Sequence, residues 1–177
     1  YGIRTGMGLS TGLLGLILLG IFLIVFFGLT SSKSNFTLVT QVPLLKDVGV
    51  SAILTAMLAA FWGYEGWNSV GFIAGEIKEP RKNIPLSLLF GLLIVIVLYL
   101  LINFTYLTLL PINQLKIVYE STNQIAAVEA VKIFWGDNGA VIISTLILIT
   151  VLACTHASVI SSSRIYYAMS NMGMFYF

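Results

Sequence analysis

The residues best suited to chemistry lie in one stretch, residues 59–68, whose sequence is AAFWGYEGWN. A carboxylate stands there beside large aromatic side chains and two glycines, within a run that is otherwise apolar from Val48 onward. The carboxylate of Glu65 can accept hydrogen bonds from a cation or can carry a proton. Glycines let the backbone leave helical geometry, which frees N–H and carbonyl groups for a ligand. The stretch therefore predicts a binding site.

Glu65 is the least expected residue of this stretch, because a carboxylate at the centre of a membrane span costs roughly 2.5–3.5 kcal/mol on insertion scales. A water-filled cavity, a cationic partner, unwound backbone or protonation can offset that cost. The alternative is a shifted span that leaves Glu65 near the membrane surface. Trp62, Tyr64 and Trp67 have a matching alternative, an aromatic belt at the interface. We expect a position within the membrane, because apolar sequence continues on both sides.

Other candidate residues have weaker signals. The amide of Asn68 has donors and an acceptor that can hold the ends of a broken helix together. His156 stands alone in apolar sequence, where a satisfied buried histidine is expected and a proton relay is the alternative. The charges at 76–82 are expected to form a solvated loop, with pairing across a gate as the alternative. The sequence contains no metal-ligand cluster, nucleophilic triad or phosphate-binding glycine motif. It therefore predicts no enzyme, no metal site and no cofactor.

Composition places these residues in a membrane protein. The 177 residues are 58% hydrophobic and 9% charged, with a mean hydropathy of +0.99, whereas an average soluble domain is about 25% charged. The net charge is +2, and the basic residues are scattered between apolar segments. A nucleic-acid partner is therefore not expected. The lipid bilayer is the expected surrounding.

Four apolar segments are long enough to cross that bilayer. They lie at about 8–30, 48–75, 84–110 and 138–164. The second segment contains Glu65 and is predicted to be a discontinuous helix. Pro85 is predicted in the first turn of the third, where its missing N–H costs nothing. Glycines on one side of the first segment predict close packing on a neighbouring helix. The expected fold is an all-α membrane protein with four transmembrane helices.

The connections between these segments also carry signals. An amphipathic helix is predicted at the membrane surface at about 121–134, with Ser121 as its N-cap. The short loop 76–84 is dense in Lys and Arg, so it is predicted to be cytoplasmic. The fourth segment ends in small polar residues, Ser161 and Ser162 among them, which in a bilayer usually face other helices or a cavity.

The sequence resembles the amino acid–polyamine–organocation permeases, and most closely the bacterial form of their L-type amino acid transporter branch. The matching segments are residues 61–68, 75–85 and 161–169, and their order and separation match as well. The resemblance implies a fragment that holds helices five to eight of a twelve-helix transporter with an inverted repeat. It also implies a multi-pass location in the cell membrane, with the remaining helices of the full-length transporter as partners.

The resemblance further implies roles for individual residues. The substrate amino acid is expected to bind to the unwound segment, which comprises Trp62, Gly63, Tyr64, Glu65 and Gly66. Trp62 is expected to close over the substrate. Apart from the resemblance, the cost of a charge in the membrane leads us to expect that Glu65 takes part in coupling, by helping to set substrate or proton dependence. Asn68 is expected to stabilise the unwound region or to link the site to gating. Ser161 and Ser162 are expected to face the region where sodium-coupled relatives bind a cation.

The predicted function is therefore secondary active transport of amino acids by alternating access, either as exchange or as proton-coupled uptake. The alternative is a non-transporting structural or regulatory membrane subunit with the same fold. The identity of the amino acid is not predicted, because the first-helix segment that holds the substrate carboxylate in this family is absent from the chain.

Overall fold

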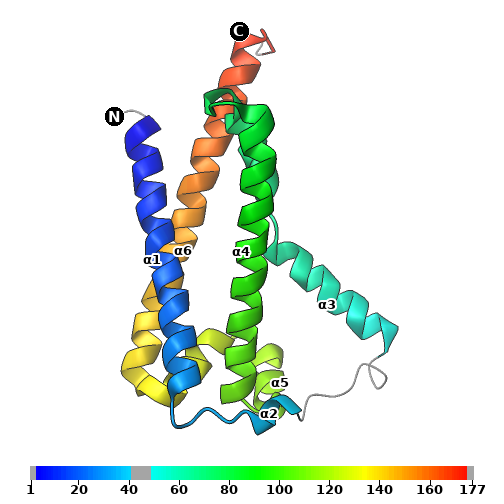
Figure 1. Cartoon of the computed structure of the whole chain (residues 1–177), viewed down its shortest axis with the longest axis vertical. Coiled ribbons are helices and arrows are strands. Elements are labelled where there is room, and N and C mark those ends of the chain that lie inside the picture. The colour runs from blue at the N-terminus through cyan, green and yellow to red at the C-terminus, as the bar shows by residue number, and fades with distance from the viewer. Residues whose placement is uncertain (1–2, 41–48, 175–177) are drawn as a thin grey trace. The chain divides into compact units, whose positions relative to one another are not determined.

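All secondary structure in the described part of the chain is helical. The computed structural model describes residues 3–40 and 49–174 (Figure 1). The elements are α1 (Ile3–Thr30), α2 (Thr37–Thr40), α3 (Val50–Gly63), the 3-10 helix η2 (Trp67–Glu76), α4 (Pro80–Leu109), α5 (Ile112–Glu120) and α6 (Ala126–Asn171). The longest helices coincide with apolar sequence, because only a helix pairs every backbone N–H and carbonyl within one segment.

Three of the described helices are long and apolar enough to cross a membrane. They are Gly8–Thr30 within α1, all of α4 and all of α6. Helix α3 ends after 14 residues, which is shorter than the roughly 17–25 residues that a span requires. The chain is therefore an all-α membrane protein with three candidate spans among its described helices, and the count of four remains a prediction.

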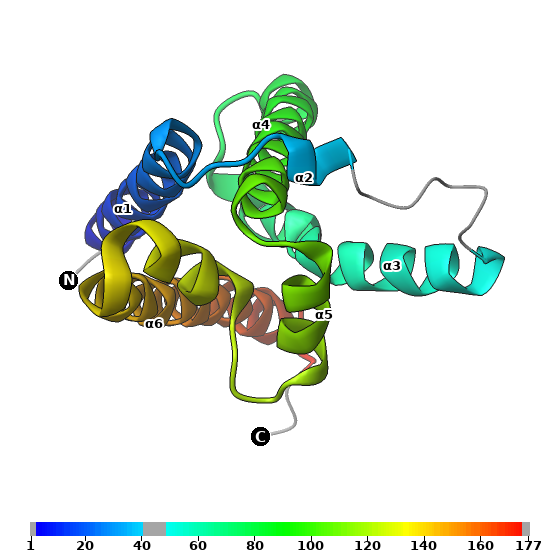
Figure 2. The ribbon, with the colours of Figure 1, turned by 90° about the horizontal axis from the view of Figure 1, so that it is seen from below.

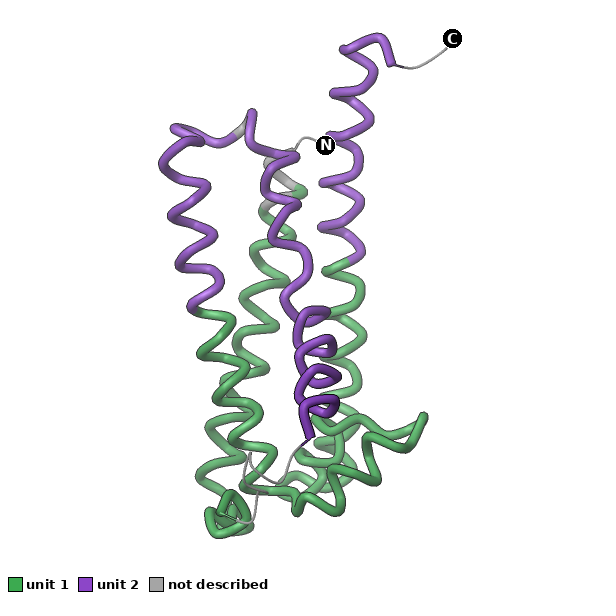
Figure 3. Tube along the Cα trace, turned by 90° about the vertical axis from the view of Figure 1, so that its right-hand side faces the viewer, with its two compact units in different colours: residues 1–42, 94–154 green, residues 43–93, 155–177 purple. Residues whose placement is uncertain are grey.

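The chain divides into two compact units (Figure 3). Unit 1 comprises Tyr1–Val42 and Ile94–Cys154, and it contains α1, α2, α5 and adjoining parts of α4 and α6. Unit 2 comprises Pro43–Leu93 and Thr155–Phe177, and it contains α3, η2 and the other parts of α4 and α6. The predicted binding residues all lie in unit 2.

The buried residues of unit 1 gather near the C-terminal ends of α1 and α4 and the beginning of α6. One cluster contains Ile24, Val131 and Ile143, and the other contains Leu109, Leu110 and Ala130. Two fully buried threonines lie among them, and their hydroxyl groups donate to carbonyls of their own helix at 2.8 Å. This core therefore encloses polar hydroxyls without leaving them unpaired.

Two glycines bring α1 close to its neighbours within unit 1. A Cβ atom at Gly28 would lie 2.5 Å from Cγ2 of Thr105, and a Cβ atom at Gly20 would meet the side chain of Leu146. Nothing lies within 4 Å of a Cβ built at Gly15. The predicted close packing of α1 thus occurs at two of its glycines, where the missing side chain lets helices approach.

The region after α4 differs from the prediction of a surface helix at 121–134. The structure has α5 there, then a loop, and a helix that begins only at Ala126 (Figure 2). Helix α5 starts early because the carbonyl of Pro111 accepts the N–H groups of Gln114 and Leu115. The prediction of Ser121 as an N-cap was wrong. Ser121 is the C-cap of α5, and its hydroxyl donates to the carbonyl of Val118 at 3.0 Å.

Helix α6 is kinked at Gly136, which has φ 65° and ψ −155°. These angles are not helical, and glycine is essentially the only residue that adopts them without strain. The kink separates segment 126–135 from segment 137–171. It falls between the predicted surface helix and the predicted fourth span.

The prediction for Pro85 was also wrong. Helix α4 begins at Pro80, so Pro80 occupies the first turn and Pro85 lies inside the helix. The residue before a proline is disfavoured in the helical region. Glu79 lies outside that region, in the left-handed region with φ 48°, and its carbonyl accepts the N–H groups of Lys82 and Asn83 at 3.0 Å. The helix therefore begins upstream of the predicted boundary at 84.

The glycine contacts predict a graded response to alanine. Gly28→Ala should destabilise the protein by about 1–3 kcal/mol, because its methyl group meets a short, fully buried threonine. Gly20→Ala should cost less, because the leucine side chain that it meets can rotate away. Gly15→Ala is the matched control, and it should be neutral or slightly stabilising because alanine favours helices. Thermal unfolding in detergent, followed by tryptophan fluorescence, measures the order of stability of the three variants. Equal melting temperatures for all three would contradict this packing.

Candidate functional site

The predicted binding stretch coincides with an interruption between α3 and η2. Helix α3 ends at Gly63, and Tyr64 is its C-cap. The N–H of Tyr64 donates to the carbonyl of Phe61 at 3.1 Å, and the N–H of Glu65 donates to that of Trp62 at 3.3 Å. Both bonds span three residues, so the last turn of the helix tightens before the chain leaves helical geometry.

Gly66 is the residue at which the chain changes direction. It has φ 105° and ψ −11°, a left-handed conformation that residues with a side chain seldom adopt. It is also the N-cap of η2, and it offers no side chain to cap the first N–H groups of that helix. Carbonyls at the end of α3 and N–H groups at the start of η2 therefore flank a three-residue break.

The aromatic side chains around the break differ in exposure. Trp62 is 83% exposed and Trp67 is 59% exposed, whereas Tyr64 is half-buried. An apolar hollow of about 250 Å³ lies beside the break and is lined by Met57, Ala60, Phe61 and Tyr64. Of the predicted binding residues, only Tyr64 lines that hollow. The two tryptophans extend from the chain and are available to a ligand or to another part of the protein.

Glu65 and Asn68 lie on either side of Gly66, and both are exposed. No side chain of the described residues forms an ion pair with Glu65. Asn68 lies in the first turn of η2. The carboxylate can therefore meet a cation or a proton from outside this unit. The Asn68 amide has donors and an acceptor that can bind backbone groups next to the break.

The two serines of the predicted coupling region lie on α6, also within unit 2. Ser161 is half-buried and Ser162 is exposed. Among the described residues, no hydrogen bond joins either serine to residues 62–68. The structure thus keeps Trp62 to Asn68 together as one local segment.

The loop before α4 has a structural function that the sequence did not predict. The side-chain amide of Asn83 donates to the carbonyl of Lys78 and closes the loop onto the first turn of α4. Lys78, Arg81 and Lys82 are exposed. A local signal was available, because Asn is one of the residues that bond nearby backbone in turns.

A hollow of about 360 Å³ in unit 1 lies between α1 and α6. Its lining is almost entirely apolar and includes Leu19, Leu23, Ile142 and Leu146. It contains none of the predicted binding residues. Such a lining offers no charged side chain that could bind the charged ends of an amino acid.

The break suits binding better than catalysis. Unwound backbone can bind an ammonium or carboxylate group, and aromatic side chains can cover an apolar one. Within residues 3–40 and 49–174, no group of three or more His, Cys, Asp and Glu residues could hold a metal ion.

Comparison with known proteins identifies transporters as relatives. The chain is 32% identical over 154 residues to the serine/threonine exchanger SteT of Bacillus subtilis, covering 86% of this chain and 33% of that protein. It is 39% identical over 69 residues to the b(0,+)-type amino acid transporter 1 of Oryctolagus cuniculus, covering 39% of this chain and 14% of that protein. The solute carrier family 7 member 12 of Mus musculus is 35% identical over 127 residues, which cover 71% of this chain and 26% of that protein.

The chain thus spans about a third of the length of the Bacillus relative. It spans a smaller part of the other two relatives. No solved structure matches it. The family model described as amino acid permease matches residues 6–176, nearly the whole chain. The apolar helices α1, α4 and α6 agree with the multi-pass membrane proteins of that family. The chain therefore belongs to the amino acid permease family.

Proposed function

We propose that this chain is part of a secondary amino acid transporter of the cell membrane that works by alternating access. Its relatives are named as transporters or exchangers of amino acids. The Bacillus relative is named as an exchanger of serine and threonine, so exchange is the first mode to test, followed by proton-coupled uptake. The remaining helices would come from the rest of a longer protein, in which this chain supplies helices five to eight of twelve.

The interruption at residues 64–66 is the observation that carries this proposal. Unpaired backbone in hydrocarbon costs several kcal/mol for each group. A helix broken at membrane depth is tolerated where it lines a cavity, and transporters use such breaks to bind substrates. In this proposal α3, the break and η2 together form one discontinuous span at about 48–75. With α1, α4 and the part of α6 after the kink, that makes four spans.

We assign the substrate amino acid to the break. The backbone from Gly63, the last residue of α3, to Gly66 binds its charged ends, and Trp62 closes over it. Trp62 suits this role because its indole ring is exposed and borders the break. Tyr64 lines the neighbouring hollow and Asn68 steadies the start of η2, so each contributes to the shape of the site.

Glu65 and the two serines are assigned to coupling. Glu65 places a titratable charge directly in the break, where it affects either proton dependence or the choice between cationic and neutral substrates. Ser161 and Ser162 lie on another helix of unit 2. Their hydroxyl groups are suited to a small cation or to another polar helix.

Replacement of Trp62 by alanine should lower initial amino acid uptake by at least about tenfold, because an aromatic lid covers a large apolar area. Uptake and counterflow with a panel of amino acids, in proteoliposomes that contain the complete transporter, measure the effect. Leu58→Ala is the matched control, since Leu58 is also exposed on α3, at 72%. Normal uptake by an inserted Trp62→Ala protein would falsify the lid. Absence of uptake by the unmodified protein would favour a non-transporting subunit with the same fold.

Replacement of Glu65 by glutamine keeps the size of the side chain and removes its charge. The pH dependence of uptake should become flatter, or the preference between cationic and neutral amino acids should shift. Glu120→Gln is the control, because Glu120 is an exposed carboxylate on α5, in unit 1. If neither the pH profile nor the selectivity moves in proteoliposomes, Glu65 is merely tolerated.

Gly66→Ala tests whether the left-handed turn is needed. A left-handed residue with a side chain costs roughly 1–2 kcal/mol, and nothing lies within 4 Å of the added methyl group. Any effect of Gly66→Ala therefore comes from backbone strain alone. We expect weaker substrate binding with normal membrane insertion. Gly71→Ala, in η2 and equally free of contacts, should bind substrate normally. Equal substrate affinity for the two variants would show that the turn is dispensable.

A further inference from the structure

A lysine in the loop after α1 reaches a distant part of the chain within unit 1. The Nζ atom of Lys33 donates to the carbonyl of Ile133 at 2.6 Å, across 100 residues of sequence. Ile133 lies just before the kink at Gly136, in the last turn of segment 126–135. The last carbonyls of a helix lack partners inside that helix, and a positive charge there is favourable. Lys33 therefore caps the end of this segment.

The same loop also caps the end of α4. The N–H of Asn35 donates to the carbonyl of Thr108 at 2.8 Å. The side-chain oxygen of Asn35 accepts the N–H of Thr37 at 3.0 Å and its hydroxyl at 2.6 Å. These two bonds fix the shape of the loop. One short loop thus joins the C-terminal end of α1 to the last turns of two other helical segments.

Apolar contacts support this arrangement. The rings of Phe27 and Trp135 lie 5.1 Å apart between centroids, and those of Phe36 and Phe104 lie 6.2 Å apart. Val131, on segment 126–135, is fully buried. Segment 126–135 is therefore held on α1 by a buried side chain, by an aromatic pair and by the Lys33 bond.

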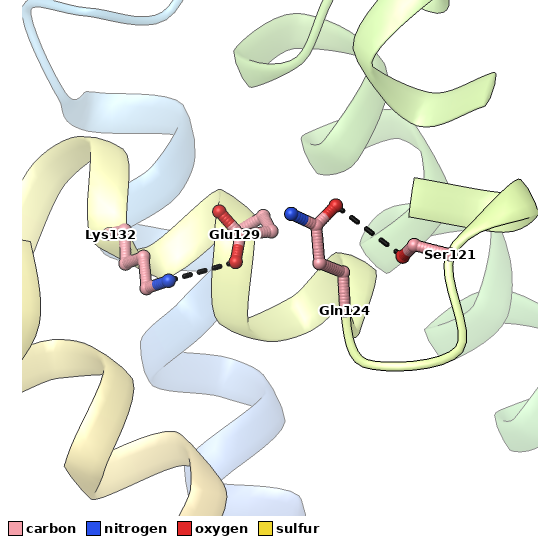
Figure 4. A network of polar contacts seen from close by, with 4 residues as sticks. All are labelled: Ser121, Gln124, Glu129 and Lys132. Carbon is pink, nitrogen blue, oxygen red and sulfur yellow. Dashed lines mark hydrogen bonds and ion pairs between the residues drawn. The ribbon is translucent and has the colours of Figure 1, made fainter. Parts of the chain in front are cut away.

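Two side-chain contacts near segment 126–135 are local (Figure 4). Lys132 donates to Glu129 at 2.9 Å, and Ser121 contacts Gln124 at 3.4 Å. Each of these bonds joins residues three positions apart, so none of them fixes the helix relative to α1. Lys33 is different because its partner is a backbone carbonyl on another element, next to a kink.

We propose that Lys33 is a positioning residue that clasps the helical hairpin, residues 112–135, to the end of α1. The hairpin and the C-terminal ends of α1 and α4 then shift as one body when the protein changes conformation. The clasp itself is independent of the proposed function. Only its effect on the rate of transport rests on that function.

Hydrogen exchange of the complete protein in lipid nanodiscs tests the clasp. Lys33→Met keeps most of the aliphatic stem and removes both charge and donor. We expect its amides at 126–135 to exchange about two- to fivefold faster, the effect of losing one cation at a helix C-terminus. Lys33→Arg keeps a cation and N–H donors, so its amides at 126–135 should exchange within about twofold of the rate in the unmodified protein. Lys116→Met is the matched control, because Lys116 is an exposed lysine of the same hairpin that pairs locally with Glu120 at 3.9 Å.

Unchanged exchange in Lys33→Met would overturn the clasp. An equal acceleration in Lys33→Arg would overturn it as well, because the charge and donors are retained there. Uptake then tests the coupled motion: Lys33→Met should lower the maximal rate with KM within about twofold, and Lys33→Arg should restore the rate. Faster exchange with an unchanged maximal rate would leave the clasp in place and refute the coupled motion. If the unmodified protein transports nothing, the proposed function fails while the exchange comparison still decides the clasp.

Discussion

Pairing of backbone hydrogen bonds in an apolar medium is the constraint on which this structure depends. Hydrocarbon offers no partner to a free N–H or carbonyl group, so the apolar segments form long helices. The chain departs from helical geometry at few places within these segments, and each has a local explanation. At Gly66 the conformation is left-handed, and at Gly136 it is accessible in practice to glycine alone. Gly66 separates α3 from η2, and Gly136 separates segment 126–135 from segment 137–171 of α6.

The two breaks have opposite surroundings. The segment that ends at Gly136 contains fully buried residues and is capped by a lysine from another element. At Gly66 the neighbouring tryptophans and Glu65 are exposed, and the N-cap supplies no side chain. A capped, packed break fixes geometry, whereas an open break leaves backbone groups for a partner. This difference supports the proposal of a substrate site at the first break and is consistent with a structural joint at the second.

Apolar length and glycine content predicted much of the fold, because both act locally. An interruption was expected where glycines, aromatic residues and Glu65 meet, and the structure has one at residues 64–66. The roles of Ser121 and Pro85 were predicted wrongly, because neighbouring prolines start the helices earlier. The partner of Lys33 could not be predicted at all, since a contact across 100 residues leaves no local pattern. The position of the break at mid-membrane remains a prediction. The role of Ser161 and Ser162 in coupling at the break also remains a prediction.

The Lys33 contact also has a consequence for the order in which the protein is made. Ile133 leaves the ribosome 100 residues after Lys33, which at about 5–20 residues per second is roughly 5–20 s later. During that interval α1 and the loop after it are already synthesised, yet the segment that Lys33 caps does not exist. Until that segment is made, the glycine face of α1 and the loop contact a temporary environment, such as lipid or the insertion machinery. Assembly of this core is therefore set by the timing of translation as well as by affinity between helices.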